Sequence, residues 1–551
     1  MTRREALLSA ALVAAVAIAV RLWAATVITF PRPEDTAYYV GVARNLLDGR
    51  GLVSDAIWSF GTPPLTFPRP AFEVWLPLPT FLDAVPMALL GPTFRAAQWA
   101  SILEGALVAV FACWLAGDVA FERSMPAGRA RTLAIGTGLT AAVYLPLVLH
   151  SVLPDSTMLF AAIVLAICLL AGRIARSHAD YPEEPIDSTD PRVFAIGLLL
   201  GAAALTRNEA IWLALGWVIV SREIARDAAS DQRGWLRLVA GAAIPALIVF
   251  APWAVRDWTV FGTPLPGQAL ANALSLHGRD IFAWQDPPTV SRYLAAGFPT
   301  LAALRWDGFV HNLVSVLLLP GIPIAAIGLV ALPWTVHGIA LRLLLVFSVI
   351  TFVATTLLFP VSTTWGTFLH ASAAVQVLLL ISALVALDRL LAAIGRRRGW
   401  TRPVAWLGPL LGIAAGALFT VALLPGFGRD GDGTRDRYAA LPAALEAAGY
   451  VHGSGAPVIT DFPIYLAETT GIPALALPDE QPQSVLLLAG AFPGTKFVVV
   501  ASNNDGIWPE IAGTSRGGQL CFEPVTLAGS GVAVPPGVEI FRIKCSGGIE
   551  L

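Results

Sequence analysis

The chain has 551 residues, of which 56% are hydrophobic and 13% are charged. Soluble domains carry roughly 25% charged residues, so this composition excludes a soluble enzyme, a disordered chain and a secreted disulfide scaffold. The formal net charge of -2 gives no overall attraction to nucleic acid, and no nucleic-acid partner is expected. Apolar runs near the roughly 20 residues that cross a bilayer recur along most of the sequence, which predicts a multi-pass protein of the cell membrane.

The first apolar run, residues 6–29, follows Arg3 and Arg4. Basic residues flanking a span stay on the cytoplasmic side, so the N-terminus is expected in the cytoplasm. A cleaved signal peptide is the alternative, because small residues lie near the end of the run. The run continues past Arg21 to Thr29, which favours a retained span.

Later apolar runs are each interpreted as a helix, because a backbone inside lipid must satisfy its own hydrogen bonds. They lie at residues 96–117, 132–149, 156–172, 236–254, 309–332, 341–359, 367–387 and 403–424. Assigning the arginine-bearing loops to the cytoplasm places four loops outside. These are two large loops, 30–95 and 255–308, and two short ones, 150–155 and 360–366.

Residues 193–221 do not fit this alternation as one helix, because Arg207 and Glu209 interrupt them. A single span would place both charges near mid-bilayer and bring the chain out on the wrong side. Two full spans would be too short to cross. A short or re-entrant hairpin keeps the alternation, which gives a mainly α helix bundle of about eleven membrane segments, with the N-terminus inside and the C-terminus outside.

The chain changes composition after residue 425. Residues 426–551 contain no spanning run and are predicted to form a small extracytoplasmic α/β domain on the membrane module of residues 1–425. Strands are expected at 458–460, 496–501 and 538–543, and helices at 438–448 and 483–491. Cys113 and Cys168 fall inside spans, whereas Cys521 and Cys545 fall in this outer domain, where a disulfide can persist.

Two acidic positions are expected at the outer face. Glu34 and Asp35 directly follow the first span, at the start of a segment whose apolar spacing predicts a helix on the membrane surface. Asp155 lies in a very short outer turn. Asp35 and Asp155 are each well placed as helix N-caps, and each is also a candidate catalytic base, with Glu34 as a further candidate catalytic residue. The two roles are compatible, because a helix N-terminus keeps a carboxylate ionised.

Three arginines are candidates for binding a lipid-borne phosphate, which guanidinium groups hold bidentately. They are Arg69 in the first outer loop, Arg207 in the hairpin turn and Arg256 at the end of a span. Two have structural alternatives, since Arg207 can pair with Glu209 and Arg256 can anchor the chain at the interface with Trp253.

Further candidates for the substrate pocket are Tyr38, Glu209 and His370. His370 opens a span at the outer face, where the alternative is an ordinary core histidine. No cofactor is certain. A divalent cation is compatible with His370 acting with Asp35, Glu73 or Asp155. The sequence contains no P-loop, dinucleotide-binding glycine motif or HExxH zinc motif.

Several short motifs in the first half of the chain occur in an order that resembles the GT-C glycosyltransferases. The similarity is to bacterial relatives of protein O-mannosyltransferases and of the lipid A aminoarabinose transferase. The motifs are Glu34-Asp35, Ala43-Arg44-Asn45-Leu46-Leu47, Gly49-Arg50-Gly51, Pro154-Asp155-Ser156, Leu205-Thr206-Arg207-Asn208-Glu209, and Pro252-Trp253 through Arg256-Asp257 to Phe261-Gly262. The residues after Arg69 and the Phe368–His370 stretch depart from the family pattern.

The resemblance implies a sugar donor carried on a polyprenyl phosphate and a general base at Asp35, with Asp155 as a candidate assistant. The acceptor hydroxyl then belongs to a protein, a glycolipid or a wall glycan, and a single displacement inverts the anomeric centre. Two other classes remain open. A lipid or small-molecule transporter or flippase would use the same bundle for passage, and a non-enzymatic envelope scaffold would use the carboxylates only as helix caps.

Overall fold

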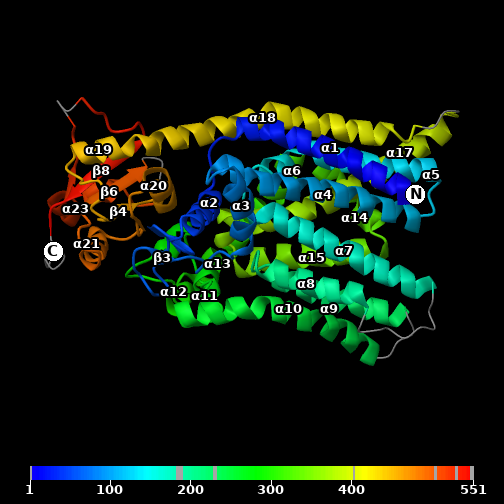
Figure 1. The fold of residues 1–551 in the computed structure, drawn as a ribbon, viewed down its shortest axis with the longest axis horizontal. Helices are drawn as coiled ribbons and strands as arrows, with labels where there is room; N and C mark the ends of the chain where they lie inside the picture. The colour runs from blue at the N-terminus through cyan, green and yellow to red at the C-terminus, as the bar shows by residue number, and fades with distance from the viewer. Residues whose placement is uncertain are drawn as a thin grey trace.

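A computed structural model describes residues 3–180, 190–227, 232–400, 404–501, 506–527 and 531–545. Long helices lie side by side along the longest axis, and a small α/β domain sits at one end, which we call the domain end of the bundle (Figure 1). The bundle helices are α1 (Arg3–Val27), α4 (Phe94–Glu122), α5 (Ala127–Val143), α6 (Leu145–His150), α7 (Ser156–Asp180), α8 (Pro191–Ala204), α9 (Ala210–Asp227), α10 (Gln232–Phe261), α15 (Gly338–Leu358), α17 (Ala373–Arg397) and α18 (Leu407–Ala439).

Seven of the described helices are long and apolar enough to cross a membrane. They are α1, α4, α7, α10, α15, α17 and α18, the last continuing into α19. The multi-pass prediction agrees with this. The total of about eleven segments stays a prediction, because α5 and α8 are shorter than a full span, with 17 and 14 residues.

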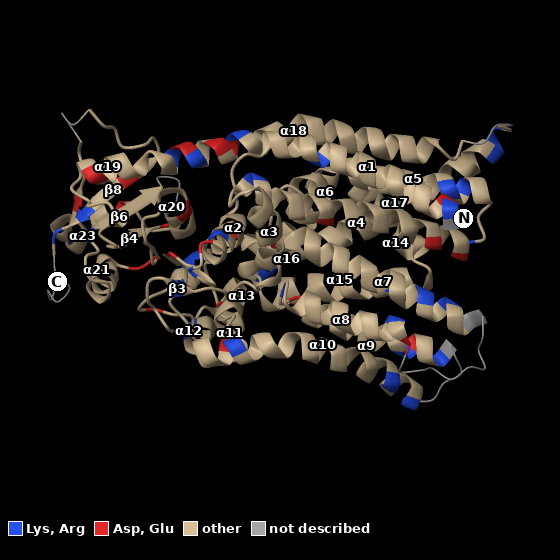
Figure 2. Ribbon diagram, viewed as in Figure 1, with Lys and Arg blue, Asp and Glu red and all other residues tan. Residues whose placement is uncertain are grey.

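Lysine and arginine positions are concentrated at the end of the bundle that carries the N-terminus (Figure 2). This is the pattern expected if that end faces the cytoplasm, because lysine and arginine are retained there. The sidedness of the domain end therefore stays a prediction with the charge pattern in its favour.

Residues 309–332, expected as one helix, do not form a continuous helix. The chain runs through α13 (Gly297–Val310), a π-helical segment η2 (His311–Leu318) and a short turn η3 (Leu319–Gly321) before α14 (Ile324–Thr335). The two parts meet at 113°. Pro320 and Pro323 bracket the break, and prolines remove backbone donors and clash with the preceding turn, so a straight helix cannot pass through this point.

The hairpin expected at 193–221 is present. Helices α8 and α9 are separate, and Arg207 and Glu209 lie in the turn between them as a paired, largely buried unit. The turn lies at the domain end, level with the first turns of α2 (Glu34–Leu47) and α7 (Figure 1).

The helix predicted to lie on the membrane surface is instead enclosed by protein. Residues 36–43 of α2 are buried on every side of the helix. It packs against α3 (Leu78–Leu90) in the first loop and against α20 (Pro463–Thr470) in the C-terminal domain. Its apolar side chains therefore seal against protein rather than lipid.

The C-terminal domain is built on a six-stranded sheet of order β2-β5-β4-β6-β8-β7. The strands are β4 (Val458–Thr460), β5 (Ala474–Ala476), β6 (Phe497–Ala501), β7 (Phe522–Pro524) and β8 (Val538–Ile543), and the helices are α19 (Leu441–Ala447), α20, α21 (Pro482–Ala491), α22 (Glu510–Thr514) and α23 (Arg516–Cys521). The three predicted strands and two predicted helices are confirmed, with α18 and α19 sharing residues 438–448.

The remaining strand, β2 (Ala56–Ile57), comes from the first loop and pairs in parallel with β5. In the same loop, β1 (Val53–Ser54) and β3 (Arg69–Pro70) lie before and after β2 in the chain and pair with each other as a two-stranded antiparallel ribbon. One apolar core joins this loop to the C-terminal domain, because Tyr38 and Phe72 belong to the same cluster as Leu475 and Val498. The shorter elements between α10 and α17 are α11 (Ala269–Ala273), η1 (Gly278–Phe282), α12 (Val290–Ala295), η4 (Ser362–Trp365) and α16 (Thr367–Ala371).

Cys521 and Cys545 form the expected disulfide, with a Cα–Cα distance of 5.0 Å. We predict that a membrane-impermeant maleimide labels neither cysteine in intact cells until an impermeant reductant is added, after which Cys545 is labelled, whereas Cys521 is fully buried. Cys113 and Cys168 are buried in α4 and α7 and serve as the internal control. Labelling without reduction would contradict the disulfide, and absence of labelling after reduction would contradict the outward sidedness.

Candidate functional site

Three ionisable side chains from distant parts of the chain meet at the domain end of the bundle. Asp35 lies in the first turn of α2, Asp155 directly precedes α7, and His370 lies in α16. His370 Nε2 is 3.3 Å from Asp35 Oδ2, and its Nδ1 is 3.7 Å from Asp155 Oδ2. The sequence predicted all three residues, and the structure brings them together.

Asp35 is the accessible member of the group. Its side chain is 27% exposed, whereas those of Asp155 and His370 are 1% and 5% exposed. A substrate can therefore reach the Asp35 carboxylate and not the other two side chains. The predicted N-cap role of Asp35 is wrong, because Pro33 occupies the cap position and Asp35 lies inside the first turn.

The surroundings of Asp35 favour its ionised form. Burial alone raises the pKa of a carboxyl group, but hydrogen bonds from His370 and Trp75 and the charge of Arg207 outweigh it, so the pKa of Asp35 is lowered. The positive end of the α2 dipole acts in the same direction. A carboxylate in this setting is a proton acceptor at neutral pH.

His370 connects the two aspartates. Its Nδ1 lies 2.8 Å from the hydroxyl of Thr157, and its Nε2 faces Asp35. Because a carboxylate can only accept, Nε2 carries a proton and donates it toward Asp35, while Nδ1 can accept from Thr157. His370 is thus buried, as an ordinary core histidine would be, and also holds a fixed orientation toward Asp35.

Asp155 has the capping role that the sequence allowed. Its Oδ1 accepts the backbone N–H of Thr157 at 2.7 Å in the first turn of α7. Its Oδ2 has no hydrogen-bond partner and faces His370. One oxygen therefore fixes the helix start while the other remains within the site.

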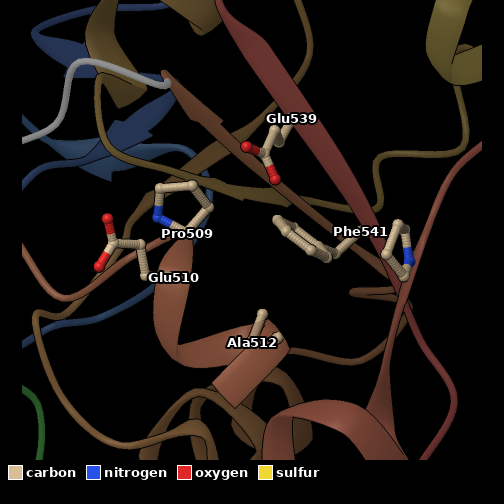
Figure 3. Close-up of a pocket in the computed structure, with 7 residues that line it drawn as sticks. Pro509, Glu510, Ala512, Glu539 and Phe541 are labelled. Carbon is tan, nitrogen blue, oxygen red and sulfur yellow. The ribbon is translucent and has the colours of Figure 1, made fainter. Parts of the chain in front are cut away.

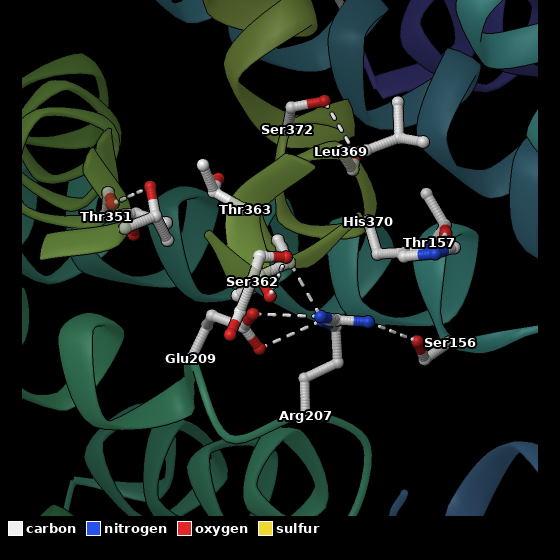
Figure 4. A network of polar contacts seen from close by, with 12 residues as sticks. Ser156, Thr157, Arg207, Glu209, Thr351, Ser362, Thr363, Leu369, His370 and Ser372 are labelled. Carbon is white, nitrogen blue, oxygen red and sulfur yellow. Dashed lines mark hydrogen bonds and ion pairs between the residues drawn. The ribbon is translucent and has the colours of Figure 1, made fainter. Parts of the chain in front are cut away.

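Arg207 holds the cationic side of the site (Figure 4). It donates two hydrogen bonds to the Glu209 carboxylate, at 2.9 and 2.8 Å, and one to Ser156 Oγ at 2.7 Å. The predicted Arg207–Glu209 pair is thus real. Arg207 also lies close enough to Asp35 to lower its pKa, so the pair belongs to the same site.

The other two arginines lie around a different carboxylate, Glu73. Arg69 is 3.0 Å from Glu73 and 1% exposed, with a further bond to the Thr62 carbonyl. Arg256 pairs with Asp257 at 2.9 Å, is 21% exposed, and stacks over Trp253 with 4.7 Å from its guanidinium carbon to the ring centre. Among the described residues, neither arginine forms an ion pair with Asp35, Asp155 or His370.

Glu34 and Tyr38 make their hydrogen bonds to backbone groups elsewhere in the protein. Glu34 Oε1 accepts the backbone N–H of Ile464 at 3.1 Å and thereby caps α20 of the C-terminal domain. Burial raises its pKa to about 8. The Tyr38 hydroxyl accepts the Phe72 N–H at 2.7 Å, and its ring packs 4.2 Å from that of Trp75. Both residues therefore hold the surrounding structure of the site in place, Glu34 through α20 and Tyr38 through Phe72 and Trp75.

Sequence reasoning missed four contributors: Trp75, Ser156, Thr157 and His150. Ser156 and Thr157 had a signal, since they follow Asp155 at a helix start. His150 had one too, as the last residue of an apolar run, and its ring centre lies 6.0 Å from that of His370. Trp75 had none, because only the folded first loop brings its indole to Asp35.

A separate pocket of about 210 Å³ lies on the C-terminal domain (Figure 3). Its walls are Pro509, Glu510, Ala512, Gly513, Pro524, Glu539 and Phe541. Among the described residues, the lining includes two carboxylates and no basic or nucleophilic side chain, and it includes none of the residues around Asp35.

The fold places the chain in a known structural class. No protein-family model and no curated protein sequence matches it. Among solved structures, ArnT from Cupriavidus metallidurans bound to undecaprenyl phosphate matches with a TM-score of 0.57 at 15% identity over 97% of each chain. The Archaeoglobus fulgidus oligosaccharyltransferase in complex with Zn and sulfate matches with a TM-score of 0.55 at 12% identity, over 94% of this chain and 71% of that one.

Both of these proteins are GT-C glycosyltransferases. The fold of the present chain is thus the GT-C fold, which confirms the resemblance seen in the ordered motifs. ArnT is the lipid A aminoarabinose transferase, one of the two kinds of relative that the motifs indicated.

The cap that Glu34 provides to α20 gives a prediction. Replacing Glu34 by Ala should lower stability by about 1 kcal/mol, because two backbone N–H groups lose their acceptor. Glu34→Gln should stay close to the wild type at pH 7, because a group whose pKa is about 8 is already mostly uncharged there. Thermal unfolding of the purified proteins in detergent compares the variants. Equal midpoints for Glu34→Ala and the wild type would contradict the capping role.

Proposed function

We propose that this protein is a membrane glycosyltransferase that moves a sugar from a polyprenyl-phosphate donor to an acceptor hydroxyl on the extracytoplasmic face. The observation that carries the proposal is the Asp35 carboxylate, accessible and held ionised between His370 and Arg207. The GT-C fold supports it, as does the solved ArnT complex with undecaprenyl phosphate. The bundle gives an isoprenoid tail a membrane path to this end.

In this reaction the carboxylate side of the site accepts a proton, and the guanidinium side stabilises the leaving phosphate. The acceptor hydroxyl donates a hydrogen bond to Asp35, which takes the proton as the oxygen attacks the anomeric carbon. The bond from that carbon to the phosphate oxygen breaks, and its electron pair leaves with the polyprenyl phosphate. Guanidinium groups stabilise the developing charge. A single displacement of this kind inverts the anomeric centre.

The supporting residues hold this arrangement in place. His370 donates to Asp35 and fixes the direction of its carboxylate, and Asp155 fixes the start of α7 beside it. Arg207 is the donor-phosphate ligand nearest to the base, and Glu209 orients its guanidinium plane. Arg256, partly exposed over Trp253, is the second. Arg69 is enclosed by protein, and its part in phosphate binding is to hold Glu73 beside Arg256.

The acceptor is proposed only as a hydroxyl compound presented at the outer face. A protein side chain, a glycolipid and a wall glycan each supply the attacking oxygen, and the site chemistry is the same for all three. A transporter or flippase and a non-enzymatic scaffold are the competing outcomes of the first test below.

Replacing Asp35 by Asn should reduce sugar transfer by about 10²–10⁴-fold, the range that a positioned general base contributes. The assay follows release of undecaprenyl phosphate from a panel of its sugar-linked forms by the purified protein. Asp436→Asn is the matched control, because Asp436 lies on α18 with a side chain 71% exposed, and it should retain the wild-type rate. Undiminished transfer by Asp35→Asn would remove Asp35 as the base. Loss of lipid flipping in proteoliposomes, with no transfer by the wild type, would favour a flippase.

The lowered pKa of Asp35 predicts the pH dependence of transfer. The base is active when ionised, so its contribution is complete above its pKa and is lost as the pH falls through that value. Since that pKa lies below the ordinary carboxyl range, kcat/KM should show no loss from this group between about pH 5 and 7. His370→Ala removes the stabilising hydrogen bond and should move the acidic limb to higher pH. An unmoved limb would show that His370 does not set the ionisation of Asp35.

A further inference from the structure

Behind Asp35 lies a buried cluster of three groups that can ligate a metal. His150 ends α6, Asp155 precedes α7, and His370 lies in α16. Each offers one ligand atom, and these three atoms all lie within 4.8 Å of one another. All three residues are buried, at 9%, 2% and 4% exposure. The proposed transfer reaction makes no direct use of His150.

Two atoms of this cluster lack any hydrogen-bond partner in the structure. They are His150 Nδ1 and Asp155 Oδ2. Leaving a buried polar atom unpaired costs about 1–3 kcal/mol, so two in one cluster require an explanation. In addition, Asp155 Oδ2 faces His370 Nδ1 at 3.7 Å, and both atoms offer lone pairs when the imidazole is neutral. A cation between them would satisfy every one of these groups.

We propose that His150, Asp155 and His370 bind one divalent transition-metal ion, with zinc as the best match. Two imidazoles and a carboxylate suit zinc and its first-row neighbours, whereas magnesium and calcium prefer oxygen ligands alone. Ligands about 2.1 Å from zinc are about 3.4 Å apart in a tetrahedron, close to the 3.7 Å between Asp155 and His370. Small side-chain rotations bring the third ligand into range.

The charges facing the cluster favour a cation. Asp155 and Asp35 place two carboxylates on the two sides of His370. Arg207 is the opposing positive charge, and Glu209 neutralises it directly. The local excess is therefore negative, and a divalent ion offsets it.

Metal binding would act on Asp35 through His370. With Nδ1 on the metal in place of the Thr157 hydroxyl, Nε2–H remains directed at Asp35, and this is the tautomer that the structure already holds. A carboxylate that accepts from a metal-bound histidine fixes the ring orientation. The metal would then position Asp35 as the base. This consequence rests on the proposed function, whereas the binding of the metal does not depend on it.

The experiment measures zinc in the untagged protein, purified in detergent, stripped with a chelator, incubated with zinc chloride and desalted. We expect one zinc per chain by elemental analysis. His150→Asn should lose it, and His452→Asn should keep it, because His452 is an exposed residue with a side chain 54% exposed. Size-exclusion elution confirms folding of each variant. The proposal would be overturned if the wild-type protein bound less than about 0.1 zinc per chain. It would also be overturned if folded His150→Asn still bound one zinc per chain.

Asp35→Asn separates this inference from the proposed function. It leaves the three ligands intact, so one zinc per chain should remain at saturation, with affinity weakened by about 10–100-fold as expected when a partner of a metal-bound histidine is lost. Zinc retained at unchanged affinity would overturn the link between the metal and Asp35. Normal transfer by this variant would overturn the role of Asp35 as base while leaving the metal site standing.

Discussion

The contact between His370 and Asp35 is the interaction on which the rest of the site depends. It joins α16, near the end of the bundle sequence, to α2 near its beginning, and it sets the direction and ionisation of the accessible carboxylate. Asp155 and Thr157 hold the other face of the same imidazole. The bundle therefore works as a frame that brings three helix starts to one place, where short helices and caps expose polar groups without exposing unpaired backbone.

The C-terminal domain contributes to this frame, although none of its described residues forms a hydrogen bond or ion pair with Asp35, Asp155 or His370. It accepts β2 into its sheet, shares an apolar core with the first loop, and packs α20 against α2. Glu34 and Asp35 are adjacent in the sequence, but one contacts the C-terminal domain and the other contacts His370. Successive side chains on a helix diverge by about 100°. Glu34 can therefore accept the Ile464 N–H of the domain while Asp35 faces His370.

The sequence predicted the membrane bundle, the hairpin, the disulfide and the central residues of the site, because charges at the ends of apolar runs have few structural roles. It failed where the outcome depended on tertiary partners. The burial of α2 beneath α20 and the pairing of β2 have no local signal. Pro320 and Pro323 are a local signal for the break between η2 and α14, but the hydropathy of residues 309–332 alone predicts one helix there. Arg69 and Arg256 were rightly seen as costly charges, yet they lie around Glu73 rather than beside Asp35.

The pairing of Ala56 with Ala474 has a consequence for biogenesis. The edge strand that completes the sheet is made early, and its partner is made about 400 residues later. At translation rates of roughly 5–20 residues per second, the early loop waits on the order of 20–80 s before it can dock. During that interval its aromatic side chains have no domain to cover them, so assembly of the domain end of this protein is tied to completion of the chain.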